Sequence, residues 1–268
     1  MKKFRLTALV LSLILVLMLG LSSCKKKEEP KDLLARIKEK GKIVIAMEGT
    51  WAPWTYHDEN DKLTGFDYEI GLLIAEKLGV EAEFVEGEWD SILAGLESGR
   101  YDMMINGVDL TEDRQKKYDF SIPYCYNKTA VIVKKDNTSI TKLEDLKGKT
   151  TANTISSTYA ELAEKYGATV IGVDDLAQTF ELLLSGRIDA TLNAEVSYYD
   201  YMKEHPEADA KIACLTDDAQ AVAIPMPKGD DSKALVEAVN KALQEIIDEG
   251  KLSELSIKYF GGDITKPN

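Results

Sequence analysis

The chain has 268 residues, of which 44% are hydrophobic and 29% charged, an ordinary balance for a globular protein. This length is enough for one large hydrophobic core or two smaller ones. The formal net charge of −13 argues against a nucleic acid or an anionic membrane surface as the partner of the folded body.

The first 23 residues have the pattern of an export signal. Lys2, Lys3 and Arg5 precede an apolar run from Leu6 to Leu21, and a basic start before a short apolar segment is typical of secreted proteins. The alternative is a retained membrane-spanning helix, but such a helix needs about 20 apolar residues and this run is shorter. We predict a lipoprotein signal peptide over residues 1–23.

Cys24 follows Leu21-Ser22-Ser23, and this sequence resembles a bacterial lipobox, in which the cysteine is lipidated and becomes the new N-terminus. Residues 25–30 are charged, have nothing to bury and suit a flexible tether. An acyl chain on Cys24 would hold an exported domain at the cell membrane. We therefore predict a lipidated tether and a leading helix over residues 24–40, and an extracytoplasmic location.

From residue 41 onward, short apolar strands alternate with amphipathic helices. This alternation favours parallel sheets with helices on their faces, which is an α/β fold. The predicted strands include 43–46, 82–85, 103–105, 130–133 and 221–224. Two helices, over 232–248 and 253–259, close the chain and are expected to return to its first part.

Residues 98–106 (SGRYDMMIN) and 185–193 (SGRIDATLN) share one pattern, in which a helix stops at glycine and a short strand ends at asparagine. The similarity is either a coincidence of common α/β sequences or a sign of two similar lobes. Two lobes would bring the strand ends at Asn106 and Asn193 to one cleft, where ligands of α/β folds bind.

The predicted domains are lobe 1 over residues 41–128 plus 221–268 and lobe 2 over residues 129–220. Because the chain would cross between the lobes twice, the crossovers would act as a hinge with a defined closing rotation.

Tryptophans follow two of the predicted strands. Trp51 and Trp89 lie just beyond strand ends, where two indole rings can hold the apolar stem of a small ligand. The alternative for each tryptophan is core packing, which we favour for Trp54 alone.

Arg114 also follows a strand end. Its planar guanidinium could bind a carboxylate through two parallel hydrogen bonds. A surface ion pair with Glu112 or Asp113 is an equal alternative.

The sequence gives little indication of a catalytic, metal or disulfide site. His57 and His205 are the only histidines and adjoin no nucleophile or metal-binding motif. We expect no cofactor and no metal. Cys125 and Cys214 are isolated, and the sequence leaves open whether they pair.

Taken in order, several motifs resemble the polar amino-acid substrate-binding proteins of ABC importers, solute-binding protein family 3. The resemblance covers the chain after the tether, and residues 189–193 (DATLN) are similar to cystine-binding members. It implies a periplasmic-binding-protein-like fold with two α/β lobes that close on a ligand. The motifs are residues 65–67 (GFD), 89–90 (WD), 98–102 (SGRYD), 111–114 (TEDR), 118–124 (YDFSIPY), 145–149 (DLKGK) and 185–190 (SGRIDA).

The resemblance also implies roles for individual residues. Trp51 and Trp89 would flank the ligand side chain, and Arg114 would hold the α-carboxylate. Glu48 stands where some relatives have an acid that contacts the ligand. The remaining contacts would come from Asn106, Gly107, Thr154, Ser156, Ser157, Thr158 and the strand end at Asn193.

One position departs from the family pattern. The family usually places an aspartate in lobe 2 for the α-ammonium, and the matching residue here is Ala194. Asp109 stands five positions before Arg114, where serine or threonine is common. Our hypothesis is that Asp109, across the cleft, has taken over the role of counter-charge for the α-ammonium. An enclosed ammonium needs such a partner. Glu195 is the rival, and a third possibility is that Asp109 merely pairs with Arg114.

We therefore predict a binding protein and not an enzyme. It would capture a polar amino acid such as cystine, glutamine or histidine and deliver it to ABC permease subunits, as a lipid-anchored monomer without a nucleic-acid partner. One alternative is an exported dehydratase-like enzyme on the same fold, which would need a general acid or base such as Glu48, Asp109 or Glu195. Another is a tethered surface protein without a ligand.

Overall fold

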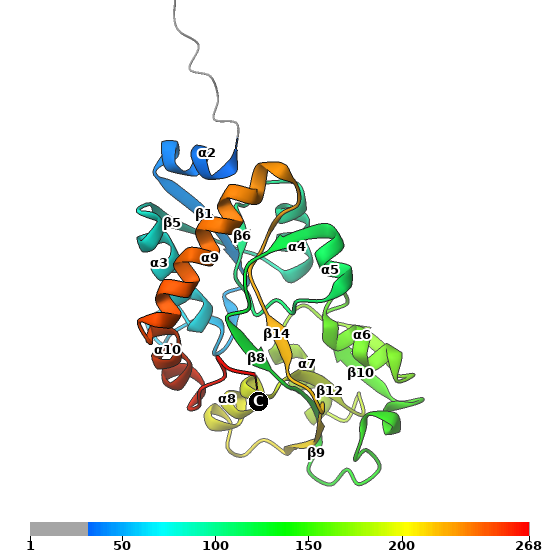
Figure 1. Cartoon of the computed structure of the whole chain (residues 1–268). Helices are drawn as coiled ribbons and strands as arrows, with labels where there is room; N and C mark the ends of the chain where they lie inside the picture. The colour runs from blue at the N-terminus through cyan, green and yellow to red at the C-terminus, as the bar shows by residue number, and fades with distance from the viewer. Residues whose placement is uncertain (1–31, 268) are drawn as a thin grey trace, which may run out of the picture. The chain divides into compact units, whose positions relative to one another are not determined.

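The computed structural model describes residues 32–267 (Figure 1). The predicted signal peptide and the predicted lipidation site Cys24 lie outside the described residues. Within the described part of the chain, no helix combines the length and the apolar character needed to cross a membrane.

The first group of strands forms a parallel sheet. Its central strand β1 (Lys42–Met47) lies between β5 (Glu81–Glu86) and β6 (Met103–Met104). The helices beside this sheet are α3 (Phe66–Leu78) and α4 (Trp89–Glu97). This arrangement agrees with the strand and helix alternation of the sequence, because each parallel strand is reached through a crossover helix.

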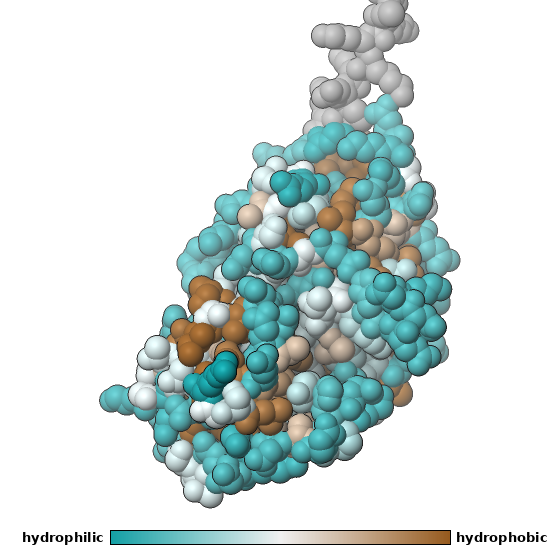
Figure 2. Space-filling model, turned by 180° about the vertical axis from the view of Figure 1, so that it is seen from behind, coloured by the Kyte–Doolittle hydropathy of each residue, from teal (hydrophilic) through white to brown (hydrophobic). Residues whose placement is uncertain are grey.

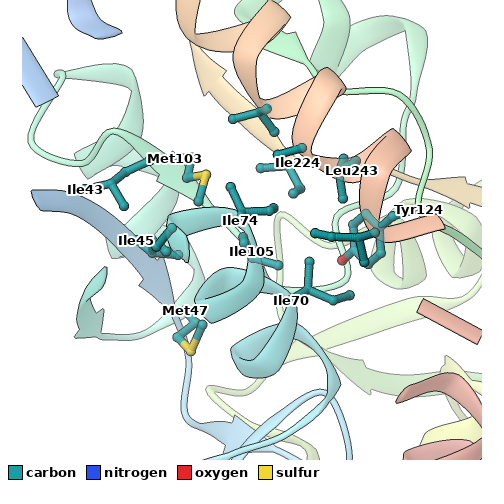
Figure 3. Close-up of a cluster of buried hydrophobic side chains, with 14 of the residues drawn as sticks. Ile43, Ile45, Met47, Ile70, Ile74, Met103, Ile105, Tyr124, Ile224 and Leu243 are labelled. Carbon is teal, nitrogen blue, oxygen red and sulfur yellow. The ribbon is translucent and has the colours of Figure 1, made fainter. Parts of the chain in front are cut away.

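The closing helices pack onto this first group. Helices α9 (Lys233–Asp248) and α10 (Lys251–Phe260) lie against α3, and α9 also contacts the leading helix α2 (Leu33–Lys40), as Figure 1 shows. Figure 3 shows the resulting core, in which Ile43, Ile45 and Met47 of β1 meet Ile70 and Ile74 of α3, with Leu243 of α9 nearby. The closing helices therefore complete a core that the first part of the chain begins.

The second group of strands is mixed. Strand β9 (Thr129–Lys134) pairs antiparallel with β12 (Thr191–Ala194) and β13 (Ala210–Leu215), whereas β10 (Thr150–Asn153) and β11 (Thr169–Gly172) pair parallel. The expectation of purely parallel sheets is therefore wrong here. Strand β9 arrives from the first group without a crossover helix, so nothing forces it to run parallel to its neighbours. The helices of this group are α6 (Thr158–Lys165), α7 (Leu176–Leu184) and α8 (Glu195–Glu204).

Two strands carry the chain between the groups. Strand β8 (Cys125–Asn127) leads into the second group, β14 (Gln220–Val222) leads back, and the two pair antiparallel. They lie side by side in Figure 1, and next to them β7 (Tyr118–Phe120) pairs with β15 (Pro225–Pro227). The described residues, 32–267, belong to one compact unit by their contacts, so the division into two lobes with the boundaries given above remains a prediction.

The sequence repeat corresponds to a repeated local structure. Helices α4 and α7 both end before a glycine with positive φ, Gly99 and Gly186, each at 73°. The aspartates of the repeat make matching bonds, because Asp102 accepts from the backbone N–H of Val44 at 2.8 Å and Asp189 from that of Thr150 at 2.8 Å. Each carboxylate thus fixes the start of its strand to a neighbouring strand.

The remaining elements are short. A small sheet consists of β2 (Thr50–Trp51), β3 (Thr55–His57) and β4 (Leu63–Thr64), in that order. Helix α5 spans Glu112–Lys117. Two 3-10 helices span Leu143–Leu146 and Asp230–Ser232. Figure 2 shows that hydrophilic side chains predominate on one face and that apolar ones gather in separate areas between them.

Candidate functional site

A cleft lies between the two groups of strands. Its walls come from strand ends and helix starts of both groups, and it contains about 590 Å³ of space that no protein atom fills, including its open mouth. The lining residues are Glu48, Thr50, Trp51, Trp89, Gly107, Asp109 and Arg114 from the first group and Asn153, Thr154, Ser157, Thr158, Tyr159, Asp175, Leu176, Thr179 and Asn193 from the second.

Arg114 is buried in this cleft, with only 9% of its surface exposed. Its backbone is set by the start of α5, where the N-cap Thr111 accepts from the Arg114 N–H at 3.2 Å. The guanidinium donates to the carbonyl oxygens of Asp109 and Ser156, each at 3.3 Å, and lies 5.3 Å from the ring centre of Trp89. The alternative of a surface ion pair is therefore wrong.

Two of the five N–H groups of Arg114 are used in these bonds, and both acceptors are neutral. Among residues 32–267 no carboxylate forms an ion pair with the guanidinium, and the neighbouring Asp113 pairs with Lys116 at 2.6 Å. The site therefore holds a buried positive charge with donors left over.

Asp109 lies beside Arg114 and is 6% exposed. Its carboxylate accepts a hydrogen bond from the Thr158 hydroxyl, across the cleft. Burial raises the pKa of Asp109, while the Thr158 hydrogen bond and the charge of Arg114 lower it. Asp109 contacts Arg114 through its backbone carbonyl, so its side chain remains directed to the second group.

Trp51 and Trp89 both line the cleft. This agrees with the prediction that the two tryptophans, which follow strand ends, lie at the binding site. Trp51 stacks on Trp54 at 5.2 Å and donates to the side-chain oxygen of Asn193 at 3.1 Å. Trp54 is 1% exposed and belongs to the core, which agrees with the prediction for that residue. The indole N–H of Trp89 is buried without a hydrogen-bond partner in the described part of the chain.

Gly107 passes very close to Trp51. Its φ is 55°, and a Cβ at this position would lie 2.6 Å from Trp51 Cζ3, so only glycine fits without rearrangement. The Gly107 N–H donates to the buried carboxyl of Asp67 at 2.6 Å, which also accepts from the Tyr124 hydroxyl at 2.9 Å. Burial raises the pKa of Asp67 to about 7. Asp67 belongs to the GFD motif, to which the sequence alone assigned no role.

Glu48 lines the cleft directly after β1. Asn106 binds it on both sides, because the Asn106 amide donates to the Glu48 carboxylate at 2.6 Å and accepts from the Glu48 N–H at 2.7 Å. Burial raises the pKa of Glu48 to about 7, the Asn106 hydrogen bond lowers it, and the charges of Asp175 and Asp90 raise it.

Ten of the predicted ligand-binding residues line the cleft, and three do not. Asn106 is fully buried and supports Glu48. Ser156 contributes its carbonyl to Arg114 and its hydroxyl to Asp90. Glu195 begins α8, and its N–H donates to the Lys128 carbonyl at 3.0 Å, away from the lining. The lining residues that the sequence did not predict are Thr50, Asn153, Tyr159, Asp175, Leu176 and Thr179.

The open question about the cysteines is resolved by the structure. Cys125 is a buried free thiol and Cys214 is a free thiol of intermediate exposure. Among the described residues, no group of three or more His, Cys, Asp or Glu side chains could hold a metal ion.

Residues 43–262 match the bacterial extracellular solute-binding proteins, family 3. The chain belongs to this family. It is 42% identical over 243 residues to the L-cystine-binding protein TcyA of Bacillus subtilis, with 90% of each chain covered. The predicted family and the α/β periplasmic-binding-protein-like fold are confirmed. Because such relatives are binding proteins, the prediction of a binding protein rather than an enzyme is confirmed as well.

Two solved structures of relatives differ in their similarity to this chain. An ancestral arginine-binding protein bound to arginine has 38% identity and a TM-score of 0.77, covering 82% of this chain and 99% of its own. The L-cystine solute receptor of Neisseria gonorrhoeae, unliganded and open, has 40% identity but a TM-score of 0.56, covering 87% and 99%. At nearly equal identity, the chain matches the ligand-bound structure better.

Replacing Asp67 by asparagine should flatten the pH dependence of stability. The folded pKa of about 7 lies above the ordinary value of 3.8, so the contribution of Asp67 is fully present below about pH 4 and is lost as the pH rises through 7. Between pH 5 and pH 8 the native protein should lose roughly 2–3 kcal/mol from this group. Asparagine keeps an acceptor for Gly107 but does not titrate.

The measurement is urea unfolding of the two proteins at pH 5, 6, 7 and 8, with the exposed Glu59→Gln as a matched control. Comparing the Asp67→Asn variant with the native protein separates Asp67 from Glu48, whose raised pKa adds a trend of the same sign to both proteins. Equal slopes for Asp67→Asn and the native protein would contradict the assignment.

Proposed function

We propose that the chain captures an amino acid in the cleft and delivers it to the permease of an ABC importer. The observation that carries this proposal is the buried Arg114 guanidinium, which has three unused N–H groups and no carboxylate partner among the described residues. A ligand α-carboxylate supplies the missing anion and fits the planar guanidinium through two parallel bonds. Family membership supports the same function.

Asp109 provides the acid for the α-ammonium in this proposal. Ala194 stands where the family usually has an aspartate, and its side chain is fully buried. The Arg114 guanidinium donates a hydrogen bond to the backbone carbonyl oxygen of Asp109, so the two residues lie side by side. One short segment of the chain therefore supplies both the cation and the anion that a zwitterionic ligand needs. Glu195 does not line the cleft, which weakens the rival assignment.

We further propose that the two groups of strands are the two predicted lobes, 41–128 plus 221–268 and 129–220. Several bonds join the groups across the cleft, among them those from Thr158 to Asp109 and from Trp51 to Asn193. The better match to a ligand-bound relative than to an open one supports a closed arrangement. Capture would begin in an open form, and closure would follow because the ligand binds the closed form more tightly.

The ligand is a polar amino acid. Relatives named for L-cystine and for arginine support this class, and the threonine and serine hydroxyls of the lining suit a polar side chain. The predicted lipid on Cys24 would keep the monomeric protein at the outer surface of the cell membrane, close to the permease.

Replacing Arg114 by glutamine should weaken binding of the preferred amino acid by at least about 100-fold, because the ligand carboxylate would then be enclosed without a cation. Lysine at this position should restore part of the affinity, since it supplies a charge without the planar fork. Isothermal titration measures both, and the exposed Arg100→Gln is the control for loss of a positive charge. Unchanged affinity in Arg114→Gln would overturn the proposal.

Asp109→Asn and Glu195→Gln separate the two candidates for the ammonium partner. We expect Asp109→Asn to weaken binding by about 10- to 100-fold, while Glu195→Gln leaves affinity within about twofold. Asparagine can still accept from Thr158, so the contact across the cleft is kept. The reverse pattern in titrations of the two variants would assign the role to Glu195.

Cys24→Ala should remove the acyl anchor from the protein. We expect the native protein in the membrane fraction of its host and the variant in soluble fractions or held by an uncleaved signal, whereas Cys214→Ser should fractionate like the native protein. Mass spectrometry of the N-terminal peptide checks for the acyl chain. A native protein without it would contradict the predicted anchor.

A further inference from the structure

Residues 193–197, at the end of β12 and the start of α8, pack against the first group of strands. Ala194 is fully buried and belongs to the same hydrophobic cluster as Trp54 and Phe66 of the first group. Val196 is partly buried and packs against this cluster as well. The second group thus completes part of the first group's core, and separating the two groups would return apolar surface to water at a cost in free energy.

The contact between Trp54 and Ser197 adds a polar bond to this apolar interface. The Trp54 ring lies 5.9 Å from that of Phe66 and 4.9 Å from that of Phe260, inside the first group. Its indole N–H donates to the Ser197 hydroxyl oxygen at 3.2 Å, and both residues are only 1% exposed. An indole carries a single N–H donor, so a residue of the second group satisfies the whole hydrogen-bonding capacity of this core side chain.

A second indole repeats the pattern. Trp51 stacks on Trp54 with 15° between the ring planes, and its N–H donates to the Asn193 side chain at 3.1 Å. Between these two acceptors, the Glu195 N–H donates to the carbonyl of Lys128, which lies between the crossover strand β8 and β9. The segment 193–197 is therefore held by two stacked indoles on one side and by a crossover on the other.

The two indole bonds differ in their relation to the cleft. Trp51 and Asn193 line it, whereas Trp54 and Ser197 do not. The bond from Trp54 to Ser197 joins the two groups and is broken when they separate, so its free energy belongs to closure. Because neither residue lies at the cleft surface, that contribution is the same for every ligand enclosed there.

Resting on the function proposed above, we infer that residues 193–197 form a latch, centred on the bond from Trp54 to Ser197, that sets how long the cleft stays closed on its ligand. Ser197 is then a positioning residue. It lowers the free energy of the closed form without touching the ligand, so it governs the rate of release and not the choice of amino acid. That choice is left to the residues that line the cleft.

Ser197→Ala should accelerate release of L-arginine and of L-cystine by about 5- to 50-fold, because the Trp54 N–H is then buried without an acceptor in the closed form. The factor should agree within about twofold for the two ligands. Stopped-flow tryptophan fluorescence measures release, since Trp51 and Trp89 remain at the cleft. A misfolded fraction would lower the amount of ligand bound but leave the release rate of the folded protein unchanged.

Trp54→Phe completes a double-mutant cycle, because it keeps an aromatic ring in the core and removes the donor. In the double variant no indole N–H is left without an acceptor, so release should be no faster than in Ser197→Ala alone. Two residues that act independently would instead multiply their separate effects. Ser185→Ala is the matched control, since this exposed serine of the second group lies outside the lining, and it should release ligand like the native protein.

Three outcomes overturn the inference. These are unchanged release in Ser197→Ala, faster release of one ligand only, and effects of the two substitutions that multiply. The function proposed above survives each of them, provided that binding still requires Arg114. If no amino acid binds the native protein, both proposals fail together.

Discussion

The guanidinium of Arg114 is buried between the two groups of strands, where its charge costs free energy unless an anion shares the site. One of its bonds goes to Asp109 of its own group and the other to Ser156 of the opposite group. The second bond exists only while the groups are together. An anion at Arg114 therefore acts where the two halves of the cleft meet, so that binding and closure are linked.

Closure is supported by further contacts at the start of α6. The hydroxyls of Ser156 and Thr158 donate to Asp90 and Asp109 on the opposite side. Each such bond contributes on the order of 1 kcal/mol, because water competes for the same groups in an open form. A few bonds of this size lower the free energy of the closed form without making that form the only one populated. The ligand then needs only its own differential affinity to shift the population.

Much of the cleft could be predicted from the sequence, because the rule that ligands meet the carboxyl ends of strands applies to apolar strands that a pattern reveals. Trp51, Trp89 and the glycine at 107 follow such strands. Asp175 was missed because the short, mostly exposed strand β11 was not among the predicted strands. The cap pattern from Asp175 to Gln178 was the available signal.

Asn106 and Glu195 stand outside the lining for a different reason, which is the direction of their side chains. Successive residues of a strand point to opposite faces, so a shift of one position exchanges lining and core. Asn193 lines the cleft and the buried Ala194 does not, whereas Asn106 turns to the backbone and side chain of Glu48. No sequence pattern records such a direction for polar residues.

Burial explains how the Glu48 carboxyl group can stand at the cleft without an ion pair. Burial keeps the pKa of Glu48 near 7, so the group can be neutral when no cation is nearby. A positive group beside Glu48 would favour its ionised form, and cation binding would then be coupled to proton release. Glu48 can thus be neutral when no positive group is near it, whereas the unused donors of Arg114 require an anion.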